Sequence, residues 1–285
     1  MSVNAGLASL PPLPPLPPRS RTIAFTSGKG GVGKSNLALN TGLLLAQRGR
    51  RVVILDGDLG LANITVLLGL SPKSDLKDVI AGDKALHEIM LEGPHGLRVI
   101  PAGGGMAEMA NLAPDEQEAL LTQLRHLEAS VDFLLIDTGA GLGDTVLNLV
   151  LASDEAVLVT MPEPTALADA YGLMKTIVQR TPVYPFHLLV NMVRDEAQAR
   201  QVHDSFSQIS QRFLGYQPGY AGGVAMDPWV AHGVVRQMPF SILAPQSRAT
   251  RCLDALVDRM LGPREQKVGG ARTFWQRLSG GARRP

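Results

Sequence analysis

The chain has 285 residues but one cysteine, Cys252, so it can form no internal disulfide and supplies no cysteine cluster for zinc or iron–sulfur. Its six histidines are scattered, and no pair has the spacing of metal ligands. No apolar stretch reaches the roughly 18 residues of a membrane-spanning helix. The N-terminus lacks the basic and apolar regions of a secretory signal, so we expect none. A single free cysteine fits a reducing compartment.

The chain also lacks an excess of either charge. Lys and Arg number 27 against 26 Asp and Glu, which gives +1 overall and no global attraction to nucleic acid. The distribution is uneven, because residues 1–21 carry +2 and residues 263–285 carry +5, which leaves −6 for the residues between them. An acidic body with a basic tail predicts that the tail meets an anionic surface.

The composition predicts three regions. Residues 1–20 form a tail whose segment LPPLPPLPP favours polyproline II, as in a docking peptide or a disordered extension. Residues 21–262 form the folded domain, since 45% of the chain is hydrophobic and can bury a sizeable core. Residues 263–285 form a linker and a short basic amphipathic helix.

Within the domain, short apolar runs rich in β-formers alternate with helix-length segments. Strands are predicted at 22–26, 51–56, 97–102, 131–137, 156–160 and 187–193, and helices at 35–47, 115–129, 165–180, 195–213 and 247–260. This alternation predicts an α/β fold with a doubly wound, mostly parallel sheet. Ligands of such sheets bind at the carboxyl ends of strands, where this sequence places Ser27, Asp56 and Asp137.

A glycine-rich turn follows the first strand and opens a helix. It reads GKGGVGKS and matches G-x-x-x-x-G-K-[ST], a phosphate-binding loop. We expect Lys34 to contact the β- and γ-phosphates and the Ser35 hydroxyl to ligate Mg²⁺. The predicted nucleotide-binding residues of this segment are Gly28, Lys29, Gly30, Gly31, Val32, Gly33, Lys34, Ser35 and Asn36. Lys29 leaves from the tip of the loop, so it is poorly placed to double Lys34 but could reach across a dimer interface.

Two further segments place acidic side chains at strand ends. Asp56 ends the second strand and can hold a water on Mg²⁺, while Asp58 follows on a glycine-flanked segment. Asp137 ends another apolar strand and is predicted to act on Mg²⁺ as a Walker-B carboxylate. An Asp-Gly-Asp sequence alone would indicate a surface turn, but its position after the second strand favours a switch segment.

The segment KGGVGKS resembles the deviant phosphate loop of the MinD/ParA ATPases. Members of that family dimerise around two ATP molecules. The resemblance implies a MinD-like P-loop NTPase fold, ATP and Mg²⁺ as cofactors, and slow, dimer-dependent ATP hydrolysis. It gives Lys29 contact with the partner's nucleotide, assigns Asp58 to the attacking water and places Asn191 near adenine.

Further phrases resemble the FlhG/FleN branch of this family: DLGLAN at 58–63, LLGL at 67–70, DTGAG at 137–141 and EPT at 163–165. That branch limits flagellar number at the cell pole and acts on flagellar gene expression. The resemblance suggests as partners a FleQ-type transcription activator, flagellar switch proteins or FlhF. Residues 224–227 read VAMD where the family often has Ile-Pro-Tyr-Asp, and no DQAxxLR-type N-terminal helix is present, so activation of FlhF by that route is unsupported.

The base is predicted to be adenine. GTPases of this fold class usually carry Asn-Lys-x-Asp, whereas residues 191–194 read NMVR and lack the lysine and the aspartate. ATP is therefore favoured over GTP.

The C-terminal tail predicts an amphipathic helix with a basic polar face that contains Arg272 and Arg277. Its apolar arc holds Val268, Ala271, Phe274, Trp275 and Leu278. One interpretation is an anionic-membrane anchor in which Phe274, Trp275, Leu278, Arg272 and Arg277 meet lipid, as in MinD relatives. It implies a cytoplasmic protein held at the inner face of the cell membrane. The alternative is a helix packed on its own domain.

Three other functions remain open at this point. A ParA-type ATPase that segregates DNA or cargo would need basic patches on the body, and the acidic body argues against DNA binding. A cluster-carrying protein of the same fold would need cysteine pairs, which are missing. A nucleotide-gated binding module would need no hydrolysis, although every catalytic position is present.

Overall fold

The computed structural model describes residues 20–58, 63–103, 105, 123, 127, 130–262 and 270–279. The proline-rich tail up to residue 19 and the 263–269 linker lie outside the described residues. The helix predicted at 115–129 does so as well, apart from two isolated positions. No helix in the described ranges is long and apolar enough to cross a bilayer.

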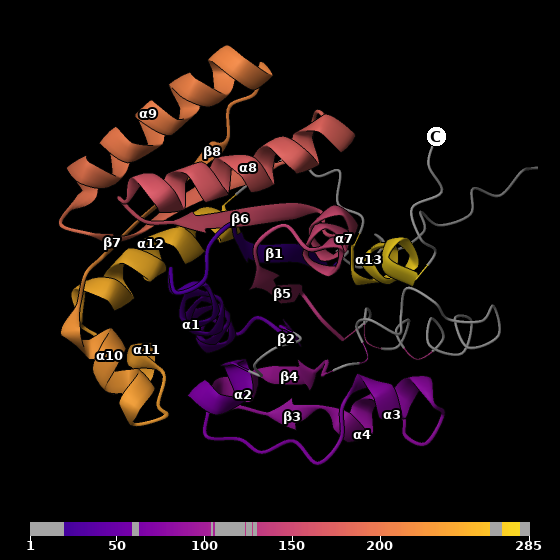
Figure 1. Ribbon diagram of the computed structural model, residues 1–285. Helices are drawn as coiled ribbons and strands as arrows, with labels where there is room; N and C mark the ends of the chain where they lie inside the picture. Colours follow the sequence, from indigo (N-terminus) through magenta and orange to yellow (C-terminus); the bar gives the residue numbers. More distant parts are fainter. Residues whose placement is uncertain are drawn as a thin grey trace, which may run out of the picture.

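One sheet runs through the molecule, with strand order β3-β4-β2-β5-β1-β6-β7-β8 (Figure 1). Its strands are β1 (Arg21–Ser27), β2 (Val52–Gly57), β3 (Leu91–Glu92), β4 (Arg98–Pro101), β5 (Phe133–Ala140), β6 (Glu155–Thr160), β7 (Phe186–Val193) and β8 (Gly219–Ala225). Neighbouring strands are parallel except β3, which is antiparallel to β4. The predicted mostly parallel α/β fold is confirmed.

Two of these strands, β3 and β8, were not predicted from the sequence. β3 has two residues, too few for a detectable pattern. β8 reads GYAGGVA, in which three glycines weaken any strand signal. Its conformation comes from pairing with β7, a contact that only the tertiary fold supplies.

Helices cover both faces of the sheet. One face is covered by α1 (Lys34–Gln47), α2 (Asn63–Leu67), α11 (Phe240–Leu243) and α12 (Arg248–Leu261). The other is covered by α3 (Leu76–Ile80), α4 (Leu86–Ile89), α7 (Asp144–Ala152), α8 (Pro164–Arg180), α9 (Glu196–Leu214) and α13 (Gly270–Ser279).

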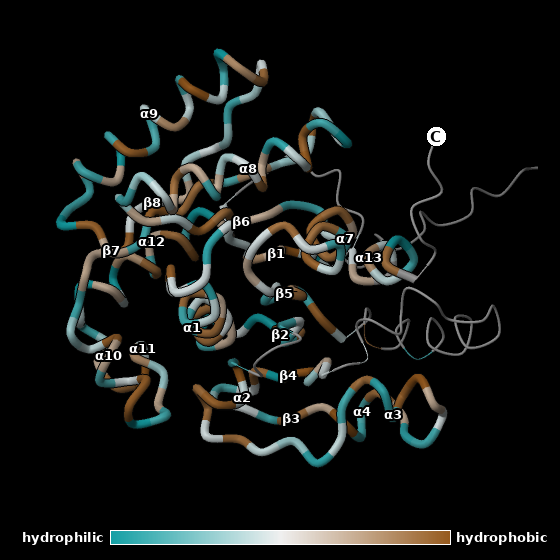
Figure 2. Tube along the Cα trace, viewed as in Figure 1, coloured by the Kyte–Doolittle hydropathy of each residue, from teal (hydrophilic) through white to brown (hydrophobic). Residues whose placement is uncertain are grey.

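Each central strand is therefore buried on both sides. In β2, Val52 and Ile54 pack toward α1, whereas Val53 and Leu55 pack on the opposite face. The remaining elements are the turn η1 (Pro94–Gly96) and the helix α10 (Pro228–Val235). Figure 2 shows hydrophobic, brown stretches on α10 and α11.

The C-terminal helix differs from the membrane-facing orientation expected for it. In α13, Phe274 and Trp275 are 0% exposed and Leu278 is 8% exposed, all in one core cluster with Leu149 and Ala152 of α7. The apolar face is thus docked on the domain. Packing beside α7 removes this face from water, as contact with lipid would.

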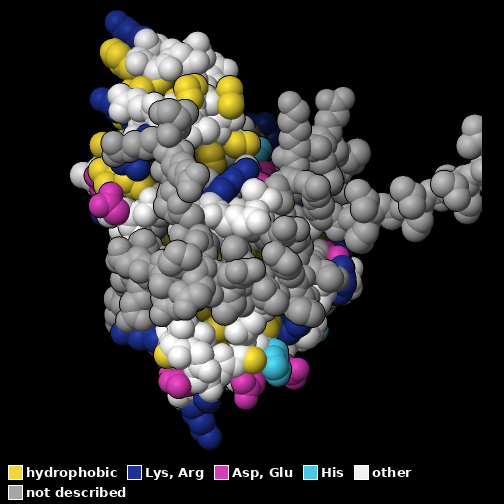
Figure 3. All heavy atoms as spheres, turned by 90° about the vertical axis from the view of Figure 1, so that its right-hand side faces the viewer, with side chains coloured by type: hydrophobic (Ala, Val, Ile, Leu, Met, Phe, Trp, Pro, Cys, Tyr) yellow, Lys and Arg dark blue, Asp and Glu magenta, His cyan; other side chains and the backbone are white. Residues whose placement is uncertain are grey.

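Polar contacts fix both ends of this docked helix. The amide of Gly270 donates to Asp154 at 3.2 Å and that of Ala271 to Ser20 at 2.7 Å. Arg277, expected on a lipid-facing surface, donates to the Ala152 carbonyl at 3.3 Å. The Arg272 side chain is not among the described ones. On the face of the molecule that includes α13, the described basic side chains are interspersed with other types rather than gathered in one field (Figure 3).

Candidate nucleotide-binding site

The glycine-rich loop connects β1 to α1 at the carboxyl edge of the sheet. Gly31 and Gly33 have φ of 79° and 89°, a left-handed conformation that favours glycine. A Cβ on Gly28 would overlap the backbone of Asp169 in α8, and one on Gly33 would overlap the Asn191 side chain. The loop sequence is therefore required by tight packing between α8 and the end of β7.

The N-terminus of α1, the helix that follows the loop, has the features of an anion-binding site. Gly33 is the N-cap of α1, and no side chain caps its first turn. The first amides of a helix have no partner within the helix, and the helix dipole favours negative charge there.

A cavity of about 630 Å³ opens over the loop, a size suited to a nucleotide. Its lining includes residues 29–36 of the loop together with Asp58, Asn191, Met192, Met226 and Val230. The predicted loop residues, Asp58 and Asn191 thus share one cavity. Gly28 instead packs against α8, and Phe274, Trp275 and Leu278 belong to a separate core cluster.

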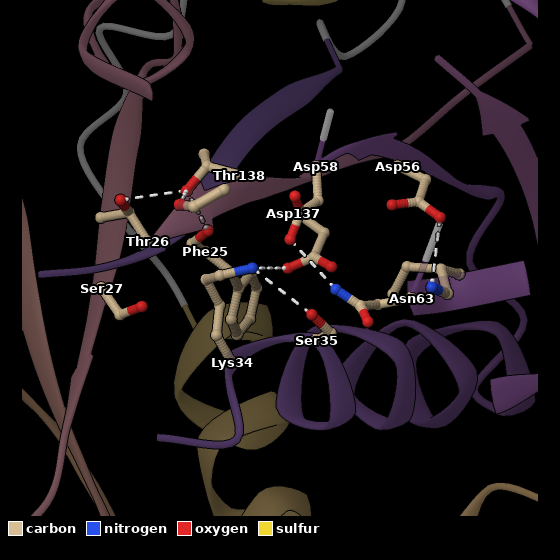
Figure 4. Close-up of polar contacts among 12 residues, drawn as sticks. Phe25, Thr26, Ser27, Lys34, Ser35, Asp56, Asp58, Asn63, Asp137 and Thr138 are labelled. Atoms are coloured by element: carbon tan, nitrogen blue, oxygen red, sulfur yellow. Dashed lines mark hydrogen bonds and ion pairs between the residues drawn. The ribbon is translucent and has the colours of Figure 1, made fainter. Parts of the chain in front are cut away.

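Lys34 points toward the strand ends rather than into solvent. Its Nζ lies 2.6 Å from Asp137 Oδ1 and 3.4 Å from Ser35 Oγ (Figure 4). Both members of the Lys34–Asp137 pair are buried. A phosphate in the loop would compete with Asp137 for this lysine, because both present anionic oxygens to it.

Asp56 and Asp137 sit opposite each other on the adjacent parallel strands β2 and β5. They are 2% and 0% exposed, and one oxygen of each has no hydrogen-bond partner. Asp56 Oδ2 accepts the Ile64 amide at 3.1 Å. Burial, helped by the charge of Asp137, raises the pKa of Asp56 to about 7. Burial also raises the pKa of Asp137, opposed by Lys34.

These orphaned oxygens fit a magnesium ion. Mg²⁺ prefers hard oxygen ligands and usually completes its shell with phosphate oxygens and water. In the described part of the chain no group of three or more His, Cys, Asp or Glu side chains that could hold a metal ion is found. Ser35, Asp56 and Asp137 are the residues that could hold the ion.

Asp58 faces the same cavity from the first switch segment. It accepts a hydrogen bond from Asn63 Nδ2 at 3.0 Å, from the start of α2. Residues 59–62 between them lie outside the described residues. On the segment that follows Asp137, Thr138 Oγ1 donates to the Phe25 carbonyl at 3.2 Å. Asn63 is a site residue that sequence reasoning did not single out, although it closes the DLGLAN phrase.

Lys29 makes its contacts within its own chain. Its Nζ lies 3.2 Å from Glu163 Oε2 and 3.1 Å from Thr165 Oγ1, both at the start of α8. This exposed pairing holds the amine at the start of α8. No local sequence pattern indicates the Glu163 contact, because 134 residues separate the partners.

Asn191 braces the loop. Its Nδ2 donates to the Val32 carbonyl at 2.8 Å, and the next residue, Met192, has φ of 56°. Asp227, in the stretch that departs from the family pattern, caps α10 through the Trp229 amide at 3.0 Å and accepts the Ala249 amide at 3.1 Å. Asp227 and Asn191 both line the cavity, and both are held by contacts within the fold.

The loop, the buried lysine and the two acidic strand ends define a P-loop NTPase. The family model described as "ParA: NUBPL iron-transfer P-loop NTPase" matches residues 19–261, so the chain belongs to this ParA/MinD family of P-loop NTPases. Within the family it is similar to the antiactivator FleN of Pseudomonas aeruginosa, with 38% identity over 240 residues that cover 84% of this chain and 86% of FleN.

Two more comparisons agree. The flagellum site-determining protein YlxH of Helicobacter pylori is 28% identical over 265 residues, or 91% of this chain and 90% of YlxH. The structure of the septum site-determining protein MinD of Pyrococcus horikoshii, complexed with Mg-ADP, superposes with a TM-score of 0.66 at 25% identity. That superposition covers 85% of this chain and 96% of MinD. The predicted FlhG/FleN resemblance is confirmed.

Proposed function

We propose that this protein is an ATP-dependent dimerising switch that regulates flagellar number and placement and flagellar gene expression. The names of its relatives FleN and YlxH motivate the biological role. The position of Lys29 supports the mechanism, since Lys29 lines the cavity and, among the described residues, its amine contacts Glu163 and Thr165 in an exposed pairing. Such pairs contribute little stability, so this contact can be exchanged for another anion.

ATP binding begins with an exchange at Lys34. The amine leaves Asp137 for the β- and γ-phosphates, which also receive the amides of the loop and of the first turn of α1. Bound with ATP, Mg²⁺ would offset negative charge on the phosphates, held by Ser35 and by Asp56 and Asp137, usually through water. The released Asp137 carboxylate thereby keeps a cationic neighbour.

Dimerisation requires a second exchange of ionic partners, this time at Lys29. Lys29 leaves Glu163 and reaches the nucleotide of a second copy, so that each subunit completes the other's site. Asp58 then orients the attacking water, with Asn63 fixing its carboxylate in the unloaded state. Loss of the γ-phosphate removes the anion that Lys29 contacts, and the dimer dissolves. Turnover is slow, because the output is the lifetime of the dimer.

Membrane association at the inner face of the cell membrane, at the pole, requires α13 to leave its contact with α7. Its apolar face cannot serve the domain and a lipid at once, since Phe274 and Trp275 are fully buried. We propose that the ATP dimer presents two released helices, whose joint binding exceeds that of one. Residues Glu163 to Lys175, at the start of α8, are the candidate surface for a FleQ-type activator, flagellar switch proteins or FlhF.

The test is the mass of the protein in solution, by light scattering with ADP or a non-hydrolysable ATP analogue, with and without anionic liposomes. We expect a monomer with ADP and a dimer with the analogue. Asp58→Ala should form a stable dimer in ATP, Lys29→Ala should stay monomeric, and Lys73→Ala, a surface lysine away from the loop, should behave as wild type. A monomeric Asp58→Ala protein in ATP refutes the scheme.

The membrane proposal has its own test. Truncation after Leu261 should abolish co-sedimentation with anionic liposomes and preserve ATP binding. Unchanged co-sedimentation would remove α13 as the anchor and leave the dimer scheme intact.

A further inference from the structure

A second cavity lies apart from the nucleotide loop, between β8, the start of α9 and α12. It has a volume of about 430 Å³ and is here called the α12 pocket. Small residues make room for it, among them Gly223 of β8 and Ala255 of α12. It shares Ala225 with the lining of the nucleotide cavity but none of the loop residues.

Three arginines of one helix line this pocket: Arg248, Arg251 and Arg259. Arg248 donates to the Arg194 carbonyl at 2.7 Å and Arg259 donates to the Ala221 carbonyl, so neither of these contacts cancels a charge. The Arg251 guanidinium makes no hydrogen bond or ion pair with any residue that the structure describes.

Two carboxylates, Asp195 and Glu196, line the pocket as well. Asp195 accepts the Gln198 amide at 2.8 Å as the N-cap of α9, and Glu196 pairs with Arg200 at 3.0 Å. A backbone amide leaves the charge of Asp195 in place, so three arginines against Asp195 and Glu196 give this hollow a small net positive charge. The body of the chain is acidic overall. A concave surface with more guanidinium groups than carboxylates attracts an anion, and the planar guanidinium matches phosphate oxygens in pairs.

We propose that the α12 pocket binds a small phosphate-bearing ligand, with Arg251 as the main contact. Its volume lies in the range of small-molecule sites, about 300–1,000 Å³. Arg251 is exposed and lines a hollow of that size, which fits a compact ligand better than an extended chain. This site is independent of the dimer scheme, because none of its residues belongs to the nucleotide loop or the switch segments.

Cys252 supplies a reporter. It lines the pocket, is partly exposed and is the chain's only cysteine, so its alkylation reports on this cavity alone. The full-length protein, loaded with ADP and Mg²⁺ to fill the loop, is treated with neutral iodoacetamide, and the rate is followed by intact mass. Glycerol 3-phosphate is added at constant ionic strength, with glycerol as the uncharged control.

We expect glycerol 3-phosphate, but not glycerol, to slow alkylation in a saturable manner. Arg251→Glu should weaken this protection by at least about tenfold, the loss of one charge-assisted contact. Arg251→Gln should weaken it to a smaller extent. Arg180→Glu, the same charge change at an exposed position of α8, should leave it unchanged.

Absence of protection in the wild type overturns the proposal, as does protection that persists in Arg251→Glu. Protection by polyglutamate or by duplex DNA, with none by glycerol 3-phosphate, would assign the surface to a macromolecule and also overturn it. Because the ADP-loaded protein is used throughout, none of these outcomes depends on whether ATP drives dimerisation.

Discussion

The buried carboxylate of Asp56 predicts how the stability of the nucleotide-free protein depends on pH. Its pKa is about 7, against an ordinary value of 3.8, because the side chain is buried beside Asp137. Between these two values the folded protein holds a proton that the unfolded chain has released. The free energy of unfolding therefore falls as pH rises from about 4 to about 7, and the cost remains above pH 7.

The size of this effect follows from the shift. About three pKa units at 1.36 kcal/mol each correspond to about 4 kcal/mol, of which about 2 kcal/mol is lost between pH 5 and pH 7. Asp56→Asn keeps the shape and can still accept the Ile64 amide, but it cannot ionise. The variant should lack this part of the pH dependence and should be more stable than wild type at pH 8.

The assay is urea unfolding followed by circular dichroism at pH 5, 6, 7 and 8, without nucleotide or Mg²⁺. Asp83→Asn, an exposed carboxylate in a turn, is the matched control and should follow the wild type. Adding Mg²⁺ and ADP should stabilise the wild type increasingly as pH rises, since the cation favours ionised Asp56. Parallel pH profiles for wild type and Asp56→Asn would refute the reasoning.

Three further predictions concern single contacts. Glu163→Gln should free Lys29 and lower the ATP-analogue concentration needed for dimers by about two- to threefold, as expected for an exposed ion pair and measured by light scattering. Asn191→Ala leaves the Val32 carbonyl without its buried donor, which costs about 1–3 kcal/mol and should weaken ATP binding about tenfold in calorimetry; an unchanged affinity contradicts the bracing role. Trp275→Ala should lower the free energy of unfolding by about 3–5 kcal/mol in urea, whereas the exposed Gln276→Ala should have little effect; similar losses for both would mean that α13 is not docked in solution.

The phosphate loop could be predicted from sequence because its chemistry is local. The spacing of Gly28 to Ser35 and the apolar strand before it are enough to orient amides, lysine and hydroxyl toward one anion. Asp56 and Asp137 could be predicted as a pair, because parallel strands bring their carboxyl ends to the same edge. The contacts of Lys29 with Glu163 and of Asn191 with Val32 could not, since they join residues far apart in the chain.

The amphipathic pattern of residues 268–278 determined that a helix would bury one apolar face, but it did not determine which surface would cover that face. Hydrophobic burial is non-directional, so a lipid surface and a groove beside α7 satisfy the same pattern, and the tertiary structure selects the groove. In the same way, the sequence determined the P-loop NTPase family, while only the fold decided that β8 completes the sheet and that the arginines of α12 line a hollow. Local patterns specify the preferences of a segment, and long-range packing specifies which neighbour meets them.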